Sequence, residues 1–297
     1  MGGRTPRHHE LIYPGYSSMT HKRREREAKE RERLEQMLTY ERKLWDAGVS
    51  HIAGVDEAGR GPLAGPVVAG AVILPMSNCY IPELNDSKKL SEKKRNRLFD
   101  QIKKQTTAIG IGIIEPREID RLNIYQATRQ AMIDALSHLS NQIQHVLIDG
   151  KPFSSFPYPY TAVVKGDSKS LSIAAASIVA KVTRDRMMVK FHEQYPLYNF
   201  AKHKGYPTQA HFAALRAYGH CPIHRRSFRG VREFFKDFSD EFYNWKNALE
   251  QAERGDGLKK IADHIAKFSH TLKSEELEEL RLIYQYRKKW LLRQHAN

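Results

Sequence analysis

The stretch from residue 52 to residue 74, which reads IAGVDEAGRGPLAGPVVAGAVIL, places two adjacent carboxylates in an otherwise apolar, glycine-rich segment. The apolar runs on both sides of Asp56 and Glu57 are short enough to be buried strands. Burying an ionised carboxylate between them costs several kcal/mol unless a cation or hydrogen-bond donors compensate for the lost water. A metal ion beside Asp56 and Glu57 is therefore one expectation. The alternative is a tight hairpin with both carboxylates on the surface, neutralised by Arg60.

Gly59, Arg60 and Gly61 follow these carboxylates, at the start of a segment rich in glycine and proline. Because glycine has no side chain, the backbone of such a turn can approach a ligand closely. An arginine between two glycines indicates an anionic ligand.

The positive charge of the chain is concentrated in its middle. Over the 297 residues the formal net charge is +15. Between Lys151 and Arg232 there are 14 lysines and arginines against 3 acidic residues, whereas the first 50 residues contain 11 against 8 and residues 240–297 contain 11 against 10. A positive field of this kind favours a polyanion as partner, since binding releases counterions. A highly charged enzyme without a polyanion is the alternative.

Composition excludes several classes of protein. Cys79 and Cys221 are the two cysteines, too few for a disulfide scaffold and without the spacing of metal ligands. No run of about 18 apolar residues could span a membrane, and the first residues lack the apolar core of a secretory signal. We therefore expect a cytoplasmic protein with no membrane association.

Two segments precede the first expected strand. Residues 1–18 mix glycine, proline, histidine and serine with little apolar content, which predicts a disordered leader. Residues 19–48 are rich in helix-forming residues with opposite charges three and four positions apart, which predicts a charged helix over 21–46. Apolar residues occur only in its second half, so we expect that half to dock and the first half to project.

The body of the chain, residues 49–235, alternates apolar runs with amphipathic segments. Strands are predicted at 51–56, 67–74, 107–114, 145–148 and 161–164, and helices at 91–104, 119–140 and 170–192. This order predicts an α/β protein with a mixed sheet whose later strands are parallel or nearly so. The tail, residues 236–297, is expected to be a helical extension in which Gly255–Gly257 separates two helices.

Asp149 and Asp167 each lie just past an apolar strand, at the edge where open α/β sheets bind ligands. With Asp56 and Glu57 they make four carboxylates, which would repel and raise one another's pKa unless cations lay among them. Oxygen ligands of this kind select Mg²⁺ or Mn²⁺ over zinc. Two such ions about 3.5 to 4 Å apart cleave phosphodiesters, one activating water and the other stabilising the leaving oxygen. Lys88 could reach a phosphate, or could belong to an ordinary solvated loop.

Six tracts of the chain together resemble bacterial ribonuclease HII, the type 2 ribonuclease H family. They are DEAGRGPLAGPVVAGAVIL, DSKKLS, VLIDG, KGDSKSLSIAAASIVAKVTRDR, HKGYPT at 203–208 and HRRSF at 224–228. The resemblance covers roughly residues 50–235. It implies a ribonuclease H-like fold, which is a five-stranded mixed sheet flanked by helices, with a helical C-terminal region that closes over the substrate.

The resemblance also implies an activity and a cofactor. The activity is endonucleolytic hydrolysis of RNA in RNA/DNA hybrids and incision on the 5′ side of ribonucleotides embedded in duplex DNA, leaving 3′-hydroxyl and 5′-phosphate ends. The family's catalytic and metal-binding set falls on Asp56, Glu57, Asp149 and Asp167, none of which is substituted. Mg²⁺ or Mn²⁺ is the implied cofactor. We expect a monomer, and a sliding clamp is a partner that the sequence leaves open.

The implied substrate contacts lie in three places. Gly59, Arg60 and Gly61 match the tract that contacts the ribonucleotide 2′-hydroxyl and adjacent phosphates, and this hydroxyl is what distinguishes RNA from DNA. Tyr206 matches the tyrosine that packs on the deoxyribose after the ribonucleotide. The side chains expected at phosphates are Lys88, Lys165, Lys169, Lys181 and Arg184.

Two other functions fit parts of this pattern. A nucleic-acid-binding protein without catalysis would not need all four carboxylates. Another nuclease of the same superfold, such as a type 3 ribonuclease H or a Holliday-junction resolvase, is the second alternative. The glycine-arginine-glycine tract together with Tyr206 favours the type 2 family.

Overall fold

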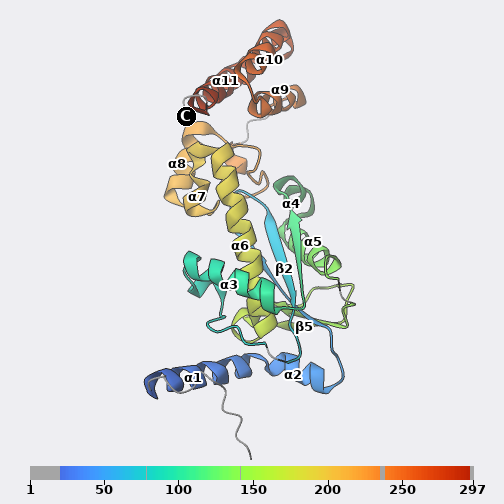
Figure 1. Cartoon of the computed structure of the whole chain (residues 1–297). Coiled ribbons are helices and arrows are strands. Elements are labelled where there is room, and N and C mark those ends of the chain that lie inside the picture. Colours follow the sequence, from blue (N-terminus) through green and yellow to red (C-terminus); the bar gives the residue numbers. More distant parts are fainter. Residues whose placement is uncertain (1–20, 78, 141, 235–237, 295–297) are drawn as a thin grey trace, which may run out of the picture. The chain divides into compact units, whose positions relative to one another are not determined.

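The computed structural model of the chain describes residues 21–77, 79–140, 142–234 and 238–294, so the expected leader lies outside it. The described chain forms two compact units (Figure 1). The sheet unit comprises the residues up to Gly61 together with Pro66–Lys190, and the helical unit comprises Pro62–Gly65 and the residues from Phe191 onward.

The sheet unit is built on five strands, which are β1 (Ile52–Ala58), β2 (Val67–Ile73), β3 (Ala108–Ile114), β4 (His145–Asp149) and β5 (Tyr160–Val163). Their order in the sheet is β3-β2-β1-β4-β5. β2 is antiparallel to both β1 and β3, whereas β4 is parallel to β1 and to β5. The mixed five-stranded sheet expected from the sequence is therefore confirmed, with its later strands parallel.

Two helices, α5 (Ile124–Ser137) and α6 (Leu171–Gln194), cover opposite faces of this sheet. A Cβ atom at Gly112 of β3 would lie 1.9 Å from a backbone oxygen of α5, and one at Gly54 of β1 would lie 2.3 Å from a backbone carbon of α6. Alternate residues of a strand point to opposite faces, and the register places these two glycines on different faces. Both helices can approach so closely because glycine leaves the space open.

The remaining helical elements of the sheet unit are α1 (His21–Met37), α2 (Thr39–Asp46), η2 (Ser87–Lys89), α3 (Glu92–Gln105), α4 (Pro116–Leu122) and η3 (Gly166–Ser168). The single helix expected over 21–46 was wrong, because the chain turns at Leu38. The backbone of Leu38 leaves helical geometry (φ −88°, ψ 4°). Its side chain is buried in the same core as Leu34 and Met37, so the second half docks as expected.

The helix expected over 119–140 is also interrupted. Asn123 has a left-handed φ of 68°, which separates α4 from α5. Its side-chain oxygen accepts hydrogen bonds from the backbone N–H groups of Tyr125 and Gln126. Asparagine tolerates this conformation and caps the next helix, so it ends one helix and begins another.

The helical unit contains η4 (Pro196–Tyr198), α7 (Phe200–His203), α8 (Gln209–Tyr218), η5 (Arg232–Phe234), α9 (Asp240–Gln251), α10 (Gly255–Lys267), η6 (Ser269–Thr271) and α11 (Ser274–Gln294). The expected break at Gly255–Gly257 was wrong. The chain leaves α9 at Ala252, which is extended, and both glycines lie in the first turn of α10. The first N–H groups of a helix have no partner within it, so glycine is tolerated there.

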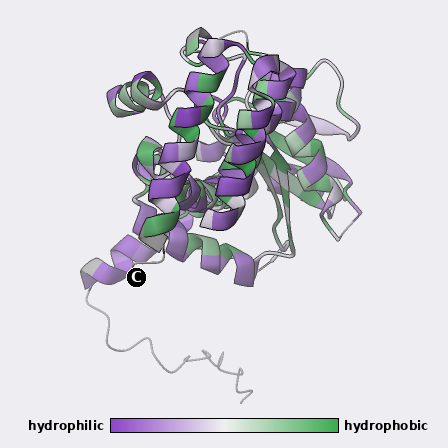
Figure 2. Cartoon of the chain, turned by 90° about the horizontal axis from the view of Figure 1, so that it is seen from above, coloured by the Kyte–Doolittle hydropathy of each residue, from purple (hydrophilic) through white to green (hydrophobic). Residues whose placement is uncertain are grey.

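The last three helices share a core of their own, formed by Phe242, Leu249, Leu258, Ile265, Leu280 and Leu291. Figure 2 shows hydrophilic and hydrophobic residues alternating along the helices, the pattern of amphipathic helices with one buried face. Across the ranges that the structure describes, no helix combines the length and apolar character needed to cross a membrane.

Candidate active site

Three aspartates from separate parts of the chain meet at one edge of the sheet. Asp56 lies on β1, Asp149 ends β4, and Asp167 lies in η3 after β5. Their carboxylate oxygens lie within 4.8 Å of one another. The register explains this, because Val55 of β1 pairs with Ile148 of the parallel strand β4 and the next residue of each strand is an aspartate. The prediction that distant carboxylates converge holds for these three.

Backbone hydrogen bonds orient two of these carboxylates. The Gly166 N–H donates to Asp149 Oδ1 at 2.6 Å, and the Glu57 N–H donates to Asp56 Oδ1 at 2.7 Å. Lys165, with a left-handed φ of 57°, makes the turn that points Gly166 toward Asp149. Two backbone N–H groups, one in η3 and one in β1, therefore orient Asp149 and Asp56.

Burial and mutual repulsion both disfavour the ionised form of the carboxylates in this site. Asp56 is 5% exposed and Asp167 is 8% exposed. Burial raises the pKa of Asp56 well above its usual range, and the charges of Glu57, Asp149 and Asp167 raise it further. Burial also raises the pKa of Asp167, with added repulsion from Asp86 and Asp149. These shifts have the sign expected where burial and like charges disfavour the ionised carboxylate.

Glu57 lies beside the three aspartates but outside the group whose oxygens approach within 4.8 Å. Burial raises the pKa of Glu57, and the charge of Asp149 raises it further. Arg60 has the opposite effect on this pKa, since its Nη1 atom lies 3.4 Å from Glu57 Oε1. Arg60 itself is half exposed, with 52% of its side-chain surface accessible. Glu57 therefore contributes charge to the site from its margin.

Lys88 of η2 lies close enough to the same carboxylates to interact with their charges. Burial disfavours its charged form, but Asp56, Asp167 and two further carboxylates outweigh this and raise its pKa. Its exposed position beside the acidic group fits the predicted phosphate contact.

Asp86 is a residue of this site that sequence reasoning missed. Its carboxylate accepts a hydrogen bond from the Lys88 N–H at 2.9 Å, which begins η2. It also lies close enough to Asp167 for its charge to raise the pKa of that residue. The signal available in the sequence was an aspartate two residues before a lysine at the start of a helical turn, which is the pattern of an ordinary cap.

The donor set fits a hard divalent cation. All the converging ligand atoms are carboxylate oxygens, which Mg²⁺ and Mn²⁺ prefer over nitrogen or sulfur. A bound cation would also offset the repulsion that raises the pKa of Asp56 and Asp167. Neither cysteine belongs to the group, and Cys79 and Cys221 are both free thiols.

Gly59 and Arg184 form a structural contact beneath the glycine-arginine-glycine turn. Gly59 has a φ of 96°, and a Cβ atom there would lie 2.1 Å from Arg184 Nε. Arg184 is fully buried and donates from Nε to the Pro66 carbonyl oxygen at 2.9 Å. The predicted phosphate contact of Arg184 does not fit this burial. Gly61, in contrast, is exposed and has nothing within 4 Å of a Cβ position.

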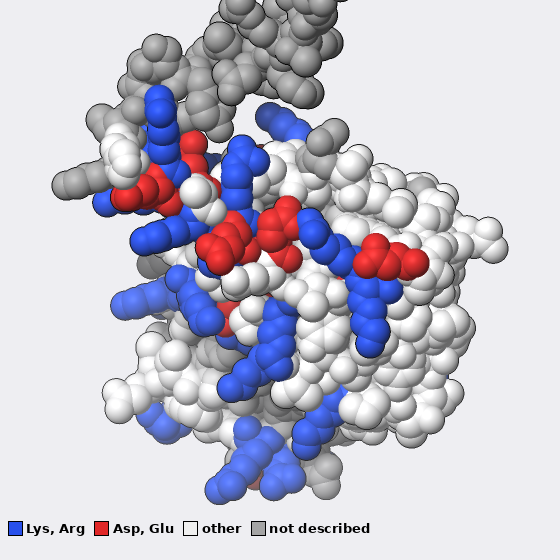
Figure 3. Space-filling model, turned by 90° about the horizontal axis from the view of Figure 1, so that it is seen from below, with Lys and Arg blue, Asp and Glu red and all other residues white. Residues whose placement is uncertain are grey.

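The remaining predicted lysines differ in exposure. Lys165 and Lys169 are exposed on either side of Asp167, where they can meet a phosphate. Lys181 is largely buried and pairs with Asp185 at 2.8 Å, so its predicted phosphate contact does not fit either. On the face drawn in Figure 3, acidic side chains lie among lysine and arginine side chains.

Tyr206 belongs to the helical unit, where its side chain is 39% exposed. Its carbonyl oxygen lies 3.0 Å from Nδ1 of the buried His211. His211 Nε2 lies 2.9 Å from His224 Nε2, whose ring accepts at Nδ1 from the Cys221 N–H. Burial lowers the pKa of His211 to about 4 and that of His224 well below its usual range, so neutral rings hold the backbone of Tyr206.

The family profile and the sequence relatives agree on one family. The profile of the family described as Ribonuclease HII matches residues 53–231. A protein named Ribonuclease HII from Bacillus cereus strain B4264 is 53% identical over 216 residues, which are 73% of this chain and 83% of the relative. Another from Bacillus anthracis strain CDC 684 is 52% identical over 219 residues, 74% of this chain and 84% of the relative.

A solved structure agrees with the sequence relatives. Ribonuclease H2 from Pyrococcus horikoshii OT3 resembles the chain with a TM-score of 0.53 and 29% sequence identity. The match covers 62% of this chain and 96% of that protein.

Proposed function

Because the chain belongs to the ribonuclease HII family and is therefore a ribonuclease H, a nuclease that hydrolyses phosphodiester bonds, we propose that it acts on two substrates. It cleaves the RNA strand of RNA/DNA hybrids, and it incises duplex DNA on the 5′ side of a single embedded ribonucleotide. The products carry 3′-hydroxyl and 5′-phosphate ends. The observation that carries this proposal is the convergence of Asp56, Asp149 and Asp167.

We infer that these three aspartates, with Glu57 at the margin, hold divalent cations, which are Mg²⁺ or Mn²⁺. When bound, a pair of such ions supplies Lewis-acid chemistry to the attacking water and to the leaving oxygen. The protein's contribution is a set of carboxylates fixed before the substrate arrives, since backbone N–H groups orient Asp56 and Asp149.

Lysines beside the site position the nucleic acid. Lys88 brings a positive charge next to the acidic group, where it attracts the phosphate that the carboxylates alone would repel. Lys165 and Lys169 are exposed around Asp167 and contact phosphates further along the strand. Together they orient the scissile phosphate toward the carboxylates.

Recognition of the ribonucleotide rests on the turn of Gly59, Arg60 and Gly61 and on Tyr206. The turn offers backbone N–H and C=O groups to the 2′-hydroxyl, and Arg184 holds it from beneath. Tyr206 presents an exposed ring that packs on the following deoxyribose. A site that requires the 2′-hydroxyl discriminates strongly against DNA, because its polar groups are otherwise left unpaired.

The test compares three duplexes of one sequence under the same Mg²⁺ and Mn²⁺ concentrations: all DNA, a long RNA/DNA hybrid, and DNA with a single ribonucleotide. We expect cleavage of the last two, no cleavage of the first, and complete inhibition by EDTA. Cleavage of the hybrid without incision at the single ribonucleotide would contradict the substrate proposal. Activity that persists in EDTA would contradict the metal proposal.

A further inference from the structure

A buried carboxylate from the N-terminal helices contacts the segment that follows Asp167. Glu41 of α2 is 1% exposed and lies outside the region matched by the family profile. Its Oε1 atom accepts hydrogen bonds from Ser170 Oγ at 2.5 Å, from the Ser172 N–H at 2.9 Å and from Ser172 Oγ at 2.6 Å. Such a carboxylate is unfavourable to bury unless donors converge on it, and here three do.

The contact lies at the N-terminus of α6, which begins at Leu171. The first N–H groups of a helix lack intrahelical partners and carry partial positive charge, so a carboxylate is favoured there. Ser170 completes the cap by accepting from the Ile173 N–H at 3.3 Å. Glu41 thereby fixes Ser170, which lies between η3 and α6, and Ser172 in the first turn of α6.

From Ser170 the contacts continue to the catalytic carboxylates. The Ser170 N–H donates to the Gly166 carbonyl oxygen at 2.8 Å, which closes the turn containing Asp167. The Gly166 N–H in turn donates to Asp149. An unbroken series of hydrogen bonds thus links Glu41 to the turn of Asp167 and to Asp149.

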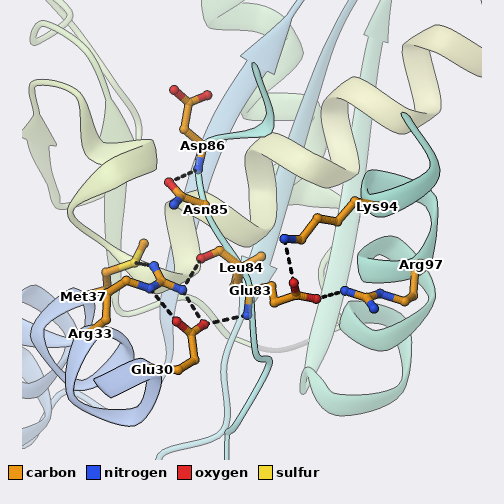
Figure 4. A network of polar contacts seen from close by, with 9 residues as sticks. All are labelled: Glu30, Arg33, Met37, Glu83, Leu84, Asn85, Asp86, Lys94 and Arg97. Atoms are coloured by element: carbon orange, nitrogen blue, oxygen red, sulfur yellow. Dashed lines mark hydrogen bonds and ion pairs between the residues drawn. The ribbon is translucent and has the colours of Figure 1, made fainter. Parts of the chain in front are cut away.

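The other N-terminal helix holds a second loop of the same site (Figure 4). Arg33 of α1 donates to the Leu84 carbonyl oxygen at 2.8 Å and pairs with Glu30 at 2.7 Å. Glu30 Oε1 accepts from the Glu83 N–H at 2.6 Å. The loop continues into Asp86, whose carboxylate accepts from the Lys88 N–H at 2.9 Å and so caps η2.

We propose that the N-terminal helices, residues 21–46, position the active site from outside the segment that the family profile matches. Glu41 acts through Ser170 and Ser172 on the turn of Asp167, and the Glu30–Arg33 pair acts through residues 83–86 on Lys88. Neither contact touches substrate, so these are positioning residues. The inference deepens the proposed function, on which it rests, by adding residues that hold its carboxylates and its lysine.

The main test compares Glu41→Ala with Glu41→Gln, which keeps one acceptor oxygen at nearly constant shape. Arg42→Ala is the matched control, since Arg42 is the next residue of α2 and is exposed. At saturating substrate we expect Glu41→Ala to lower kcat by about tenfold or more, because small displacements of catalytic groups have large effects. KM should change by less than about twofold, since the lysines supply the binding. Glu41→Gln should recover part of the loss.

Amide hydrogen exchange of the full-length protein without metal or substrate gives a second readout. In Glu41→Ala the amides of residues 165–173 should exchange faster, while those of β2 and β3 keep the wild-type rate. Normal kcat and unchanged exchange at 165–173, with only a lower Tm, would overturn the proposal by showing that Glu41 is merely structural. If Glu41→Ala does not fold, Ser172→Ala, which removes one donor, must show the same local exchange change.

For the α1 contact, Arg33→Ala should raise KM and leave kcat within about twofold, because Lys88 binds phosphate. Exchange at residues 83–90 should increase at the same time, and unchanged KM and exchange would overturn this part. The exchange data do not depend on substrate choice. A wild-type protein that fails to incise single ribonucleotides would therefore refute the proposed function without deciding the positioning role.

Discussion

The backbone N–H of Gly166 donates a 2.6 Å hydrogen bond to Oδ1 of Asp149. This bond ties the turn that carries Asp167 to the end of β4. The carboxylates of Asp149 and Asp167, which are 18 positions apart in the sequence, are therefore held close together. Asp56 joins them because β1 is the parallel neighbour of β4. The convergence of the three aspartates therefore depends on the order of the strands in the sheet and on the turn that carries Asp167.

Replacing Asp56 by asparagine should separate catalysis from binding. The substitution removes a negative ligand at nearly constant shape, so we expect cleavage to fall by orders of magnitude. Binding at low ionic strength should survive, because contacts between lysines and phosphates supply most of the affinity. Single-turnover rates and filter-binding titrations measure the two effects. Equal losses in both would indicate that Asp56 supports the fold.

The same substitution should stabilise the metal-free protein at neutral pH. Burial and neighbouring charges raise the pKa of Asp56 in the folded state, so protonation favours folding. That stabilisation is complete below the unfolded pKa of about 3.8 and is lost as the pH rises through the folded value. In EDTA, Asp56→Asn should therefore melt above wild type at pH 7, and the difference should shrink toward pH 4. The exposed Asp100→Asn is the control, and a difference independent of pH would refute this account.

Divalent cations should stabilise the wild-type protein without substrate. A ligand that binds only the folded state raises stability by RT ln(1 + [L]/Kd), so Tm should rise with Mg²⁺ or Mn²⁺ concentration. Asp149→Asn should abolish most of this rise, because it removes one of the three converging carboxylates. Thermal melts at increasing metal concentration, with Ca²⁺ and a matched NaCl series as controls, measure the effect. An equal rise in the variant would place the cation elsewhere.

Removing the ring of Tyr206 should affect the two substrates unequally. We expect Tyr206→Ala to reduce incision at a single ribonucleotide more than cleavage of a long hybrid, since only the former has a defined junction with DNA. Tyr206→Phe keeps the ring and should stay close to wild type. Ratios of kcat/KM for the two substrates provide the measurement. A uniform loss in both would argue against junction recognition by this tyrosine.

Adding a methyl group at Gly59 should destabilise the fold. The positive φ and the 2.1 Å approach to Arg184 Nε leave no room for a Cβ atom. We expect Gly59→Ala to lower the free energy of unfolding by about 1–3 kcal/mol. Gly61→Ala is the matched control, because its Cβ position is open, and it should melt like wild type. Denaturant unfolding of both variants tests this, and equal stability would show that Arg184 moves aside without cost.

Local patterns explain which parts of this site the sequence could reveal. Asp149 and Asp167 follow apolar runs that could only be strands, and Asp56 lies within one, so their convergence followed from the rule that ligands bind at strand ends. Arg184 and Lys181 lie in the basic region between Lys151 and Arg232. Composition alone could not distinguish them from the exposed lysines of that region. The burial of Arg184 against Pro66 depends on how α6 lies on the sheet, whereas Lys181 pairs with Asp185 one turn along the same helix.

Sequence alone thus determined the strands, the mixed sheet and the identity of the converging aspartates. The reason is that the apolar runs of the strands, and the aspartates within or just after them, can be recognised in the sequence itself. Tertiary structure alone decided that Asp86 meets Asp167 and that Glu41 caps α6. Glu41 lies in a charged helix and Asp86 in a polar loop, where acidic residues are common and carry no distinctive pattern. Their partners lie far along the chain, and only the folded path of the backbone brings each acidic residue close to its partner.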